Sequence, residues 1–258
     1  MASAIVGGLC RAGMAGASLL VIEPVQAQRD KLQAEHGVQA LASANARLAE
    51  ARLVVWAVKP QLFKDAAAPC APFVGRALQL SVMAGLRSDA IAAASGASRV
   101  VRAMPNTPAL IGAGIAGLCA SAAVTPQDRA FIERVLAPTG RLLWVEREAD
   151  LDAVTALSGS GPAYFFYLVE AMTTAGVQLG LSSAQARELA FATCAGAAAQ
   201  GLSSGEDAAV LRERVTSKGG TTYAALASLQ RDGVDVAMQR AVLAAAARAR
   251  ELGDEFGQ

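Results

Sequence analysis

Up to about residue 147 the sequence alternates between short apolar runs and longer, more polar segments. The runs that predict strands are residues 18–23, 53–58, 78–83, 99–104, 114–120 and 141–146. Helical patterns, such as residues 25–36 and 126–137, lie between several of them. Short apolar strands that alternate with helices are typical of βαβ units, in which helices cover both faces of a parallel sheet. We therefore predict a dinucleotide-binding, Rossmann-like, doubly wound α/β domain over residues 1–148.

From Ala149 onward the strand signals vanish. The segments that follow have helical patterns, at residues 161–176, 182–199, 206–214 and 234–252. This change predicts an all-α domain over residues 149–258.

The last helical segment is apolar on nearly every side. One face carries Met238, Val242, Ala245, Ala249 and Leu252, and alanines cover much of the remainder. A helix that is apolar all round needs to be buried, and so small a domain cannot bury this one alone. We therefore predict a homodimer formed through the helical domain. The alternative is an alanine-rich sequence without such an interface.

Charge and composition exclude several classes of protein. The 258 residues carry 23 basic and 22 acidic side chains, mixed along the chain, so no basic stripe predicts nucleic-acid binding. The 4 cysteines lie far apart, which disfavours a metal site and fits buried thiols in a reducing compartment. Charged residues interrupt every apolar run before the ~20 residues of a membrane span, and the start lacks the pattern of a secretion signal. We expect a cytoplasmic protein with no metal, no membrane contact and no nucleic-acid partner.

The usual dinucleotide loop, G-x-G-x-x-G/A, is absent. The sequence instead opens on MASAIVGGL, which is typical of the helix that follows such a loop, with Ala2 in the place of its final small residue. Glu23 ends the next apolar run, where a carboxylate would accept hydrogen bonds from the ribose hydroxyls and favour NADH. Arg29 could offset the repulsion of the additional phosphate of NADPH. The alternative for Glu23 is a solvated turn residue.

Lys59 and Pro60 directly follow an apolar strand, on the side of the sheet where open α/β folds bind ligands. Residues 81–86 and the loop that presents Asn106 also lie at the ends of apolar strands, on this side of the sheet. The one histidine, His36, lies at a predicted helix end beside a glycine, so we expect no histidine to act as a catalytic acid or base. Reduction of a protonated imine needs mainly correct positioning, and it fits this set of residues.

Four motifs occur in a fixed order: AVKPQ (57–61), RAMPNTPA (102–109), LSGSGPAY (157–164) and VTSKGGTT (215–222). With these motifs, the chain resembles the pyrroline-5-carboxylate reductase family over essentially its whole length. The resemblance implies reduction of L-1-pyrroline-5-carboxylate to L-proline with NADPH or NADH, the last step of proline biosynthesis. It also implies dimers that often assemble further into decamers through the helical domain.

The resemblance assigns residues to both ligands. The backbone of Ser217, Gly219, Gly220 and Thr221 would hold the substrate carboxylate, because N–H groups at a helix start attract anions. Thr222 would hydrogen-bond the ring nitrogen and is the predicted catalytic residue. An ordinary Ser/Thr helix cap is the alternative for this loop. The predicted cofactor-binding residues are Ala2, Glu23, Asn45, Ala57, Val58, Lys59, Pro60, Val82, Met83, Ala84, Asn106 and Glu148.

One departure separates the chain from this family. Relatives begin with a short strand and a glycine loop of the GxGNMA type, and Met1 here matches the methionine within that loop. We expect Met1 to be an internal methionine of a longer protein, because every later motif is intact. The alternatives are a truncated, non-catalytic oligomeric paralogue and a related imine or β-hydroxyacid dehydrogenase. The sequence leaves open the NADH or NADPH preference, assembly beyond a dimer and inhibition by proline.

Overall fold

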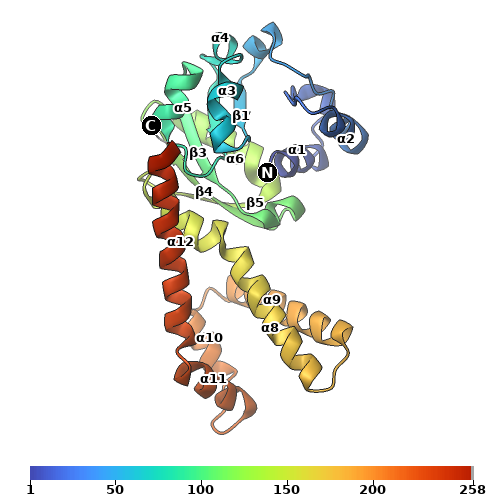
Figure 1. The fold of residues 1–258 in the computed structure, drawn as a ribbon, viewed down its shortest axis with the longest axis vertical. Coiled ribbons are helices and arrows are strands. Elements are labelled where there is room, and N and C mark those ends of the chain that lie inside the picture. Colours follow the sequence, from blue (N-terminus) through green and yellow to red (C-terminus); the bar gives the residue numbers. More distant parts are fainter. Residues whose placement is uncertain (257–258) are drawn as a thin grey trace. The chain divides into compact units, whose positions relative to one another are not determined.

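The computed structural model describes residues 1–256 and divides the chain into two compact units (Figure 1). The first comprises Met1–Ser160 together with the chain from Ala244 onward, and the second is Gly161–Leu243. The last helix, α12 (Val234–Phe256), therefore contributes to both units. The predicted domain boundary at residue 148 lies earlier than the division after Ser160.

The first unit is built on one five-stranded sheet in the order β1-β2-β3-β4-β5. Its strands are β1 (Leu53–Trp56), β2 (Leu78–Ser81), β3 (Val100–Met104), β4 (Gly114–Ala120) and β5 (Gly140–Trp144). β1, β2 and β3 are parallel, whereas β4 runs antiparallel to β3 and β5 parallel to β4. The prediction of an all-parallel sheet is wrong at β4. Only residues 105–113 join β3 to β4, and a parallel crossover needs a dozen residues or more.

The predicted strand at residues 18–23 is also wrong. This segment pairs only at an isolated parallel bridge between Ile22 and Leu41, and it begins in the short turn η1 (Gly16–Ser18). Its side chains still alternate like those of a strand. Leu19 packs into one core of the unit, and Leu20 and Ile22 pack into the other. The segment has the alternation of a strand but lacks a neighbouring strand with which to form a ladder.

The edge of β1 that faces away from β2 has no strand beside it. The β1–β2 register pairs Val54 with Gln79, and Arg52 and Trp56 accept hydrogen bonds from the β2 side. Because alternate residues of a strand bond to opposite neighbours, the N–H and C=O groups of Leu53 and Val55 face this open edge. An unpaired edge of this kind offers backbone groups to another strand.

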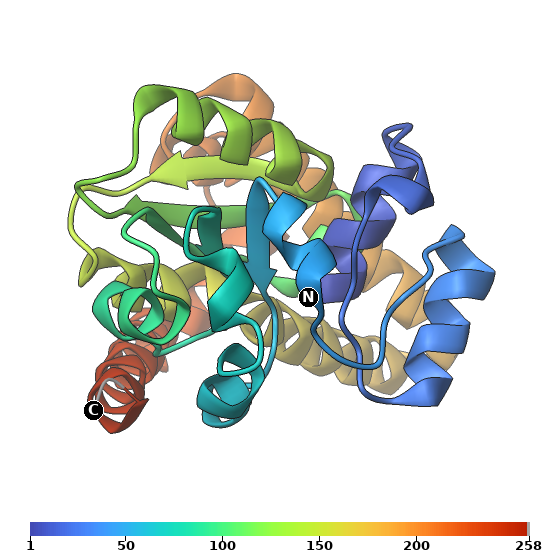
Figure 2. The same cartoon turned by 90° about the horizontal axis from the view of Figure 1, so that it is seen from above.

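Helices lie on both faces of the sheet (Figure 2), and an apolar core packs on each face. One core packs α1 (Ala2–Arg11) and α6 (Pro126–Leu136) against the sheet through residues such as Ile5 and Ile132. The other packs α3 (Phe63–Ala67), α4 (Ala71–Val74) and α5 (Ser88–Ser95) through residues such as Phe63 and Ile91. The remaining elements are α2 (Gln26–His36), η2 (Ala46–Glu50), η3 (Pro60–Leu62), η4 (Thr107–Ile111), η5 (Ala137–Thr139), α7 (Asp150–Val154) and the π-helical turn η6 (Thr155–Gly159).

Local signals placed several helix ends correctly. Thr125 and Asp128 form a capping box at the start of α6, each side chain accepting from the backbone N–H of the other. His36 is the last residue of α2, and Gly37 ends that helix with a left-handed φ of 64°. Both helices were predicted at these positions.

The second unit is entirely helical, as predicted. It contains α8 (Gly161–Gln178), α9 (Ser183–Ser204), α10 (Ala208–Arg214), α11 (Thr221–Arg231) and the first part of α12. α8 and α9 pack as a hairpin, with Gly176 so close to Ala186 that a Cβ there would lie 2.8 Å from the alanine methyl group. No helix within residues 1–256 is both long and apolar enough to cross a membrane.

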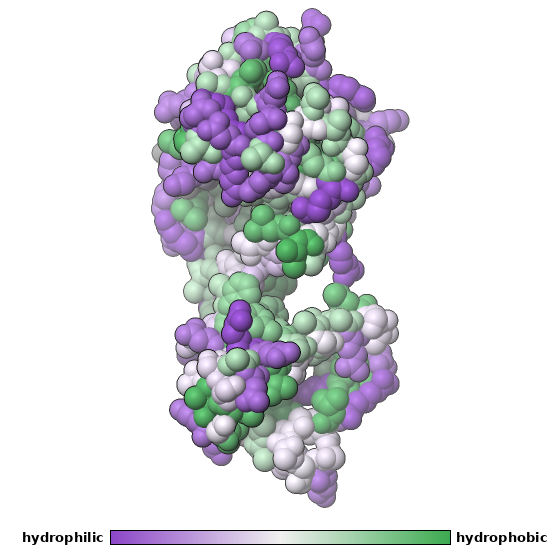
Figure 3. All heavy atoms as spheres, turned by 90° about the vertical axis from the view of Figure 1, so that its right-hand side faces the viewer, coloured by the Kyte–Doolittle hydropathy of each residue, from purple (hydrophilic) through white to green (hydrophobic). Residues whose placement is uncertain are grey.

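Large apolar side chains on the second unit remain exposed, and Figure 3 shows hydrophobic surface over its helices. The α8 and α9 side chains that are at least 40% exposed include Phe165, Phe166, Tyr167, Met172, Leu189, Phe191 and Leu202. Monomeric proteins rarely leave so much contiguous apolar surface in water. The predicted apolar face of α12 is present, with Ala249 buried and Met238, Val242, Ala245 and Leu252 half-buried.

The sheet permits no side chain at Gly140, which begins β5 with a φ of 131°. A Cβ there would lie 2.1 Å from the carbonyl oxygen of Gly114. We expect Gly140→Ala to lower the free energy of unfolding by about 3 kcal/mol or more, because neither backbone can move away. The matched control, Gly37→Ala, also has a positive φ but meets no atom within 4 Å, and it should cost about 1 kcal/mol. Equal losses in urea denaturation would contradict this account.

Candidate active site

The loops after β1, β2 and β3 share one edge of the sheet. These three strands run parallel, so their carboxyl ends lie together, which is where open α/β sheets bind ligands. The backbone N–H of Val82 donates to Trp56 O at 3.0 Å, and this bond joins the loop after β2 to the end of β1. The structure thus places the segments Ala57–Pro60 and Val82–Ala84 side by side, as predicted from their positions in the sequence.

The loop after β1 exposes its charged residue. Lys59 is exposed and precedes η3, and among the described residues no carboxylate pairs with its ammonium group. Val58 is 37% exposed, and Ala57 is half-buried. A free ammonium group beside small side chains can approach an anionic ligand. The cofactor-binding roles of these residues remain predictions.

The loop after β3 is closed by its own asparagine. Asn106 Oδ1 accepts a hydrogen bond from the backbone N–H of Ile115, 3.1 Å away, at the start of β4. The side chain therefore stabilises the turn between the two antiparallel strands. Only its amide NH₂ group is left to contact a ligand. Asn106 remains a predicted cofactor-binding residue, with fewer groups free to hydrogen-bond a ligand.

Three further predicted cofactor residues lie near the start of the chain. Glu23 Oε1 accepts from the Val25 N–H at 2.9 Å, and Arg29 donates to the carbonyl oxygens of Glu23 and Pro24. Asn45 Oδ1 accepts from the Arg47 N–H at 3.0 Å and caps η2. These contacts fit the simpler interpretation of Glu23 as a turn residue, but its second carboxylate oxygen remains available. Arg29 lies beside Glu23 and donates to its backbone carbonyl oxygen.

Ala2 is exposed and begins α1, and no side chain caps this helix start. The first N–H groups of a helix lack partners within the helix and attract anions. This is the point at which dinucleotide-binding folds hold a pyrophosphate. Ala2 thus begins a helix, and its cofactor-binding role remains a prediction.

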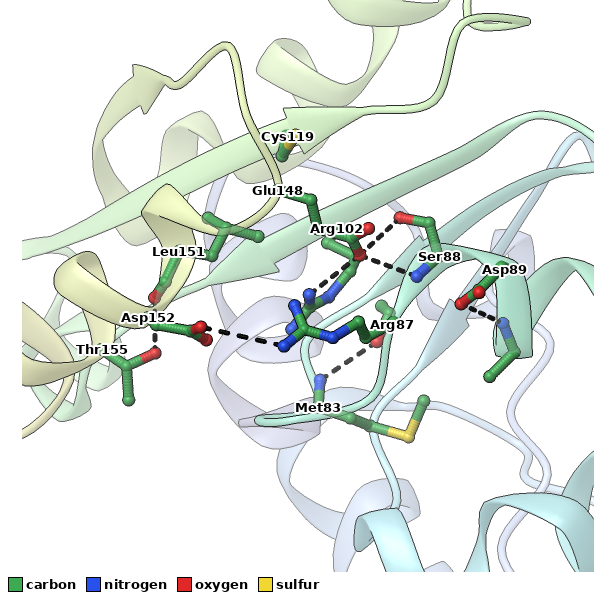
Figure 4. A network of polar contacts seen from close by, with 12 residues as sticks. Met83, Arg87, Ser88, Asp89, Arg102, Cys119, Glu148, Leu151, Asp152 and Thr155 are labelled. Carbon is green, nitrogen blue, oxygen red and sulfur yellow. Dashed lines mark hydrogen bonds and ion pairs between the residues drawn. The ribbon is translucent and has the colours of Figure 1, made fainter. Parts of the chain in front are cut away.

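Glu148 belongs to a polar network in the interior of the first unit (Figure 4). Its Oε1 accepts from Arg102 Nη1 at 2.9 Å, from the Ser88 N–H at 2.7 Å and from Ser88 Oγ at 2.8 Å. Burial alone would raise the pKa of the Glu148 carboxyl, but Arg102 and the two Ser88 donors outweigh that effect. The pKa of the carboxyl is therefore lowered. One oxygen of the Glu148 carboxylate accepts all three of these hydrogen bonds. The cofactor-binding role of Glu148 remains a prediction.

Arg102 is the buried cation of this network, with its side chain only 6% exposed. Its Nε is buried and has no hydrogen-bond partner. The neighbouring thiol of Cys119 has a raised pKa, first because of burial and then because of the Glu148 charge. The sequence analysis missed Arg102 and Ser88. An arginine inside the apolar run RVVRAM was the available signal, because a buried guanidinium requires an acidic partner.

In the second unit, a glycine loop leads into α11. Gly219 has a φ of 77°, and the Gly220 N–H donates to Ser217 O at 3.0 Å. A Cβ on Gly220 would lie 2.5 Å from Ser217 Oγ, so a side chain there would displace the Ser217 hydroxyl. Thr221 and Thr222 occupy the first turn of α11, where backbone N–H groups have no carbonyl partner within the helix. The predicted substrate residues thus form one anion-attracting turn.

This turn is accessible. Ser217, Gly219 and Thr221 are exposed, and Gly220 and Thr222 are half-buried. Glu206, two residues before α10, and Arg214, the last residue of α10, form a bidentate ion pair with distances of 2.5 and 2.6 Å. This pair connects the two ends of the helix that enters the loop. Among residues 1–256 no cluster of three or more His, Cys, Asp or Glu side chains could hold a metal ion.

Comparison with known proteins gives consistent matches over both units. A family model described as pyrroline-5-carboxylate reductase dimerisation matches residues 148–252. The chain is 42% identical over 260 residues to the pyrroline-5-carboxylate reductase of Pseudomonas aeruginosa, covering 100% of this chain and 95% of that protein. It is 36% identical over 262 residues to that of Vibrio alginolyticus, covering 99% and 95%.

Solved structures show the same similarity. A pyrroline-5-carboxylate reductase from Coxiella burnetii aligns with a TM-score of 0.90 and 34% identity, covering 97% of this chain and 94% of that one. The pyrroline carboxylate reductase of Plasmodium falciparum, solved with NADP bound, aligns with a TM-score of 0.85 and 27% identity over 97% and 94%. The predicted Rossmann-like fold followed by a helical domain is confirmed by these matches.

The lowered pKa of Glu148 predicts an acid-dependent part of the stability. A carboxyl whose pKa is lower in the folded state stabilises the fold above its ordinary value of 4.5, and this contribution is lost as the pH falls through the folded-state pKa. Glu148→Gln should therefore flatten the decline of unfolding free energy below about pH 4.5. At neutral pH it should cost about 3 kcal/mol, because Arg102 stays buried without a counter-charge. The exposed Glu50→Gln is the control, and a Glu148→Gln profile parallel to the wild type would contradict the assignment.

Proposed function

The chain belongs to the pyrroline-5-carboxylate reductase family, and we propose that it reduces L-1-pyrroline-5-carboxylate to L-proline with NADPH or NADH, the last step of proline biosynthesis. The observation that carries this proposal is the glycine turn at the start of α11, in a chain whose other unit presents ligand-binding strand ends. A small cyclic acid suits the first feature, and a dinucleotide suits the second.

The first unit fits a dinucleotide. Its strand ends carry small residues, Ala57 and Ala84, where a ligand must approach the backbone closely, and the N-terminus of α1 is uncapped. Lys59 would attract the phosphates, and Glu23 would accept from a ribose hydroxyl, with Arg29 beside it. The nicotinamide would supply a hydride to the carbon of the substrate C=N bond.

The second unit fits the substrate carboxylate. Backbone N–H groups of Thr221 and Thr222 at the start of α11 would receive it, because the helix dipole adds to their hydrogen bonds. The Thr222 hydroxyl would hydrogen-bond the ring nitrogen and hold the proton there. Among the described residues the one histidine ends α2 in the first unit, so we assign it no part in the proton transfer. Positioning would then supply most of the catalysis.

We also propose a homodimer formed through the helical unit. The match to a dimerisation family and the exposed aromatic side chains of α8 and α9 support it. Phe166 and Phe191 already meet edge to face at 6.5 Å and offer a hydrophobic centre for the interface. Decamers formed from such dimers, and a place in the cytoplasm, follow from the family resemblance alone.

A non-catalytic oligomeric protein is the second candidate function. The open edge of β1 favours it, because an unpaired strand edge can pair with another chain. The two candidates differ in whether the protein oxidises NAD(P)H when the imine is supplied.

The substrate proposal can be tested at Gly220. The purified protein should consume NAD(P)H and form proline when pyrroline-5-carboxylate is added. Gly220→Ala should raise the KM for this substrate about tenfold or more, because the new methyl group would displace Ser217 Oγ and distort the turn. In the control Gly205→Ala the new Cβ meets no atom within 4 Å, at a φ of 68° that Gly220, with a φ of -81°, does not share. If both variants had the same KM, the turn would not be the carboxylate site.

The open edge of β1 makes a second prediction. An N-terminal extension with an apolar strand and a G-x-G turn should pair with Leu53 and Val55 and complete the donor set at Ala2. We expect it to tighten dinucleotide binding about tenfold or more, measured by titration of NADH fluorescence. An extension of equal length with both glycines replaced by alanine is the control. Equal affinity of the original and extended forms would refute the idea that the edge limits binding.

A further inference from the structure

The loop between β2 and α5, residues 82–87, is covered by the last turns of α12. Gly85 has a φ of 77°, and a Cβ on it would lie 3.1 Å from Leu252 O and 3.2 Å from Leu252 C. The backbone of α12 therefore lies directly against the backbone of the loop. A glycine is required here both for its conformation and for this close approach.

Arg87 adds a side-chain connection at the same place. Its Nη2 lies 4.0 Å from Asp152 Oδ2 in α7 and 3.8 Å from Asp254 Oδ1 in α12, and Figure 4 shows the first of these pairs. The guanidinium also packs on Gly253, which is buried. A Cβ on Gly253 would lie 2.8 Å from the same nitrogen atom. The arginine is therefore enclosed between α7 and α12.

The next residue anchors the other side of the loop. Both the backbone N–H and the hydroxyl of Ser88 donate to Glu148, at 2.7 and 2.8 Å. Glu148 in turn accepts from the buried Arg102 of β3. The loop is thus held from three elements: α12 at Gly85, α7 and α12 at Arg87, and the chain before α7 at Ser88.

The two Arg87 ion pairs contribute too little to the stability of the fold to account for this arrangement. Both pairs are long, and the Asp254 side chain is 79% exposed, so each contributes about 0–1 kcal/mol at most. A mainly apolar side chain would cover Gly253 as well. The planar guanidinium also fixes the orientation of the Arg87 side chain, because it contacts carboxylates on two different elements and packs on a glycine.

We propose that Arg87, seated on Gly253 of α12, is a positioning residue that sets the depth of the loop segment Val82–Ala84 for the dinucleotide. This inference rests on the proposed function, in which that segment lines the cofactor. Arg87 lies three residues beyond Ala84 and acts through the backbone of the loop. A loop displaced by a fraction of an ångström holds the dinucleotide less well, because a binding site depends on the residues that support it.

The test compares Arg87→Met with Arg248→Met, which removes an arginine of α12 whose ion pairs among the described residues are with Glu251 and Glu255. We expect Arg87→Met to raise both the KM and the directly measured Kd for NADH or NADPH about fivefold, with kcat within about twofold of the wild type. The melting temperature should change as little as that of Arg248→Met. Arg87→Lys should restore part of the loss.

Gly253→Ala probes the same contact from the side of α12 and keeps the charge of Arg87. It should raise the dinucleotide Kd in the same direction, by about twofold, because the methyl group displaces the guanidinium. Unchanged Kd values in both variants, or a lower kcat with unchanged KM, would overturn the inference while leaving the proposed function intact. A wild-type protein that bound no dinucleotide would contradict the proposed function and this inference together.

Discussion

Parallel hydrogen bonding between β1, β2 and β3 is the constraint on which the candidate cofactor site depends. It brings three loops that are distant in the sequence to one edge of the sheet. The bond from the Val82 N–H to Trp56 O makes two of these loops neighbours. Where the chain turns back, at the antiparallel β4, the loop closes on itself through Asn106. The loops after β1 and β2 therefore have more side-chain groups free to contact a ligand than the loop after β3.

Polar groups in the first unit divide into two kinds. Arg102 and Ser88 both donate to Glu148, and the buried Arg102 charge would be costly without this partner. Lys59 pairs with no carboxylate among the described residues, and no side chain caps the start of α1. The interior set holds the loops in place, and the second set is available to an anionic ligand. Arg87 joins the two, since it connects the cofactor loop to α7 and α12.

Much of this could be predicted from the sequence because the signals are local. The capping box at Thr125, the glycine end of α2 and the glycine pair before α11 depend on a few adjacent residues, and all three form. The strand at residues 18–23 was mispredicted because pairing needs a neighbour, which a run of apolar residues cannot supply. The antiparallel direction of β4 relative to β3 follows from the short connection between these two strands. The contacts of Arg87 with α12 join residues more than 160 positions apart, so no local pattern reveals them.

The central claim is that the chain transfers a hydride to the C=N carbon of a small cyclic imino acid. The most direct measurement supplies pyrroline-5-carboxylate and NADH or NADPH deuterated at the transferable position, and then locates the label by mass spectrometry and NMR. The account predicts proline with one deuterium on the ring carbon that formed the C=N bond. Unlabelled proline, or no proline from a folded protein that binds the dinucleotide, would contradict it.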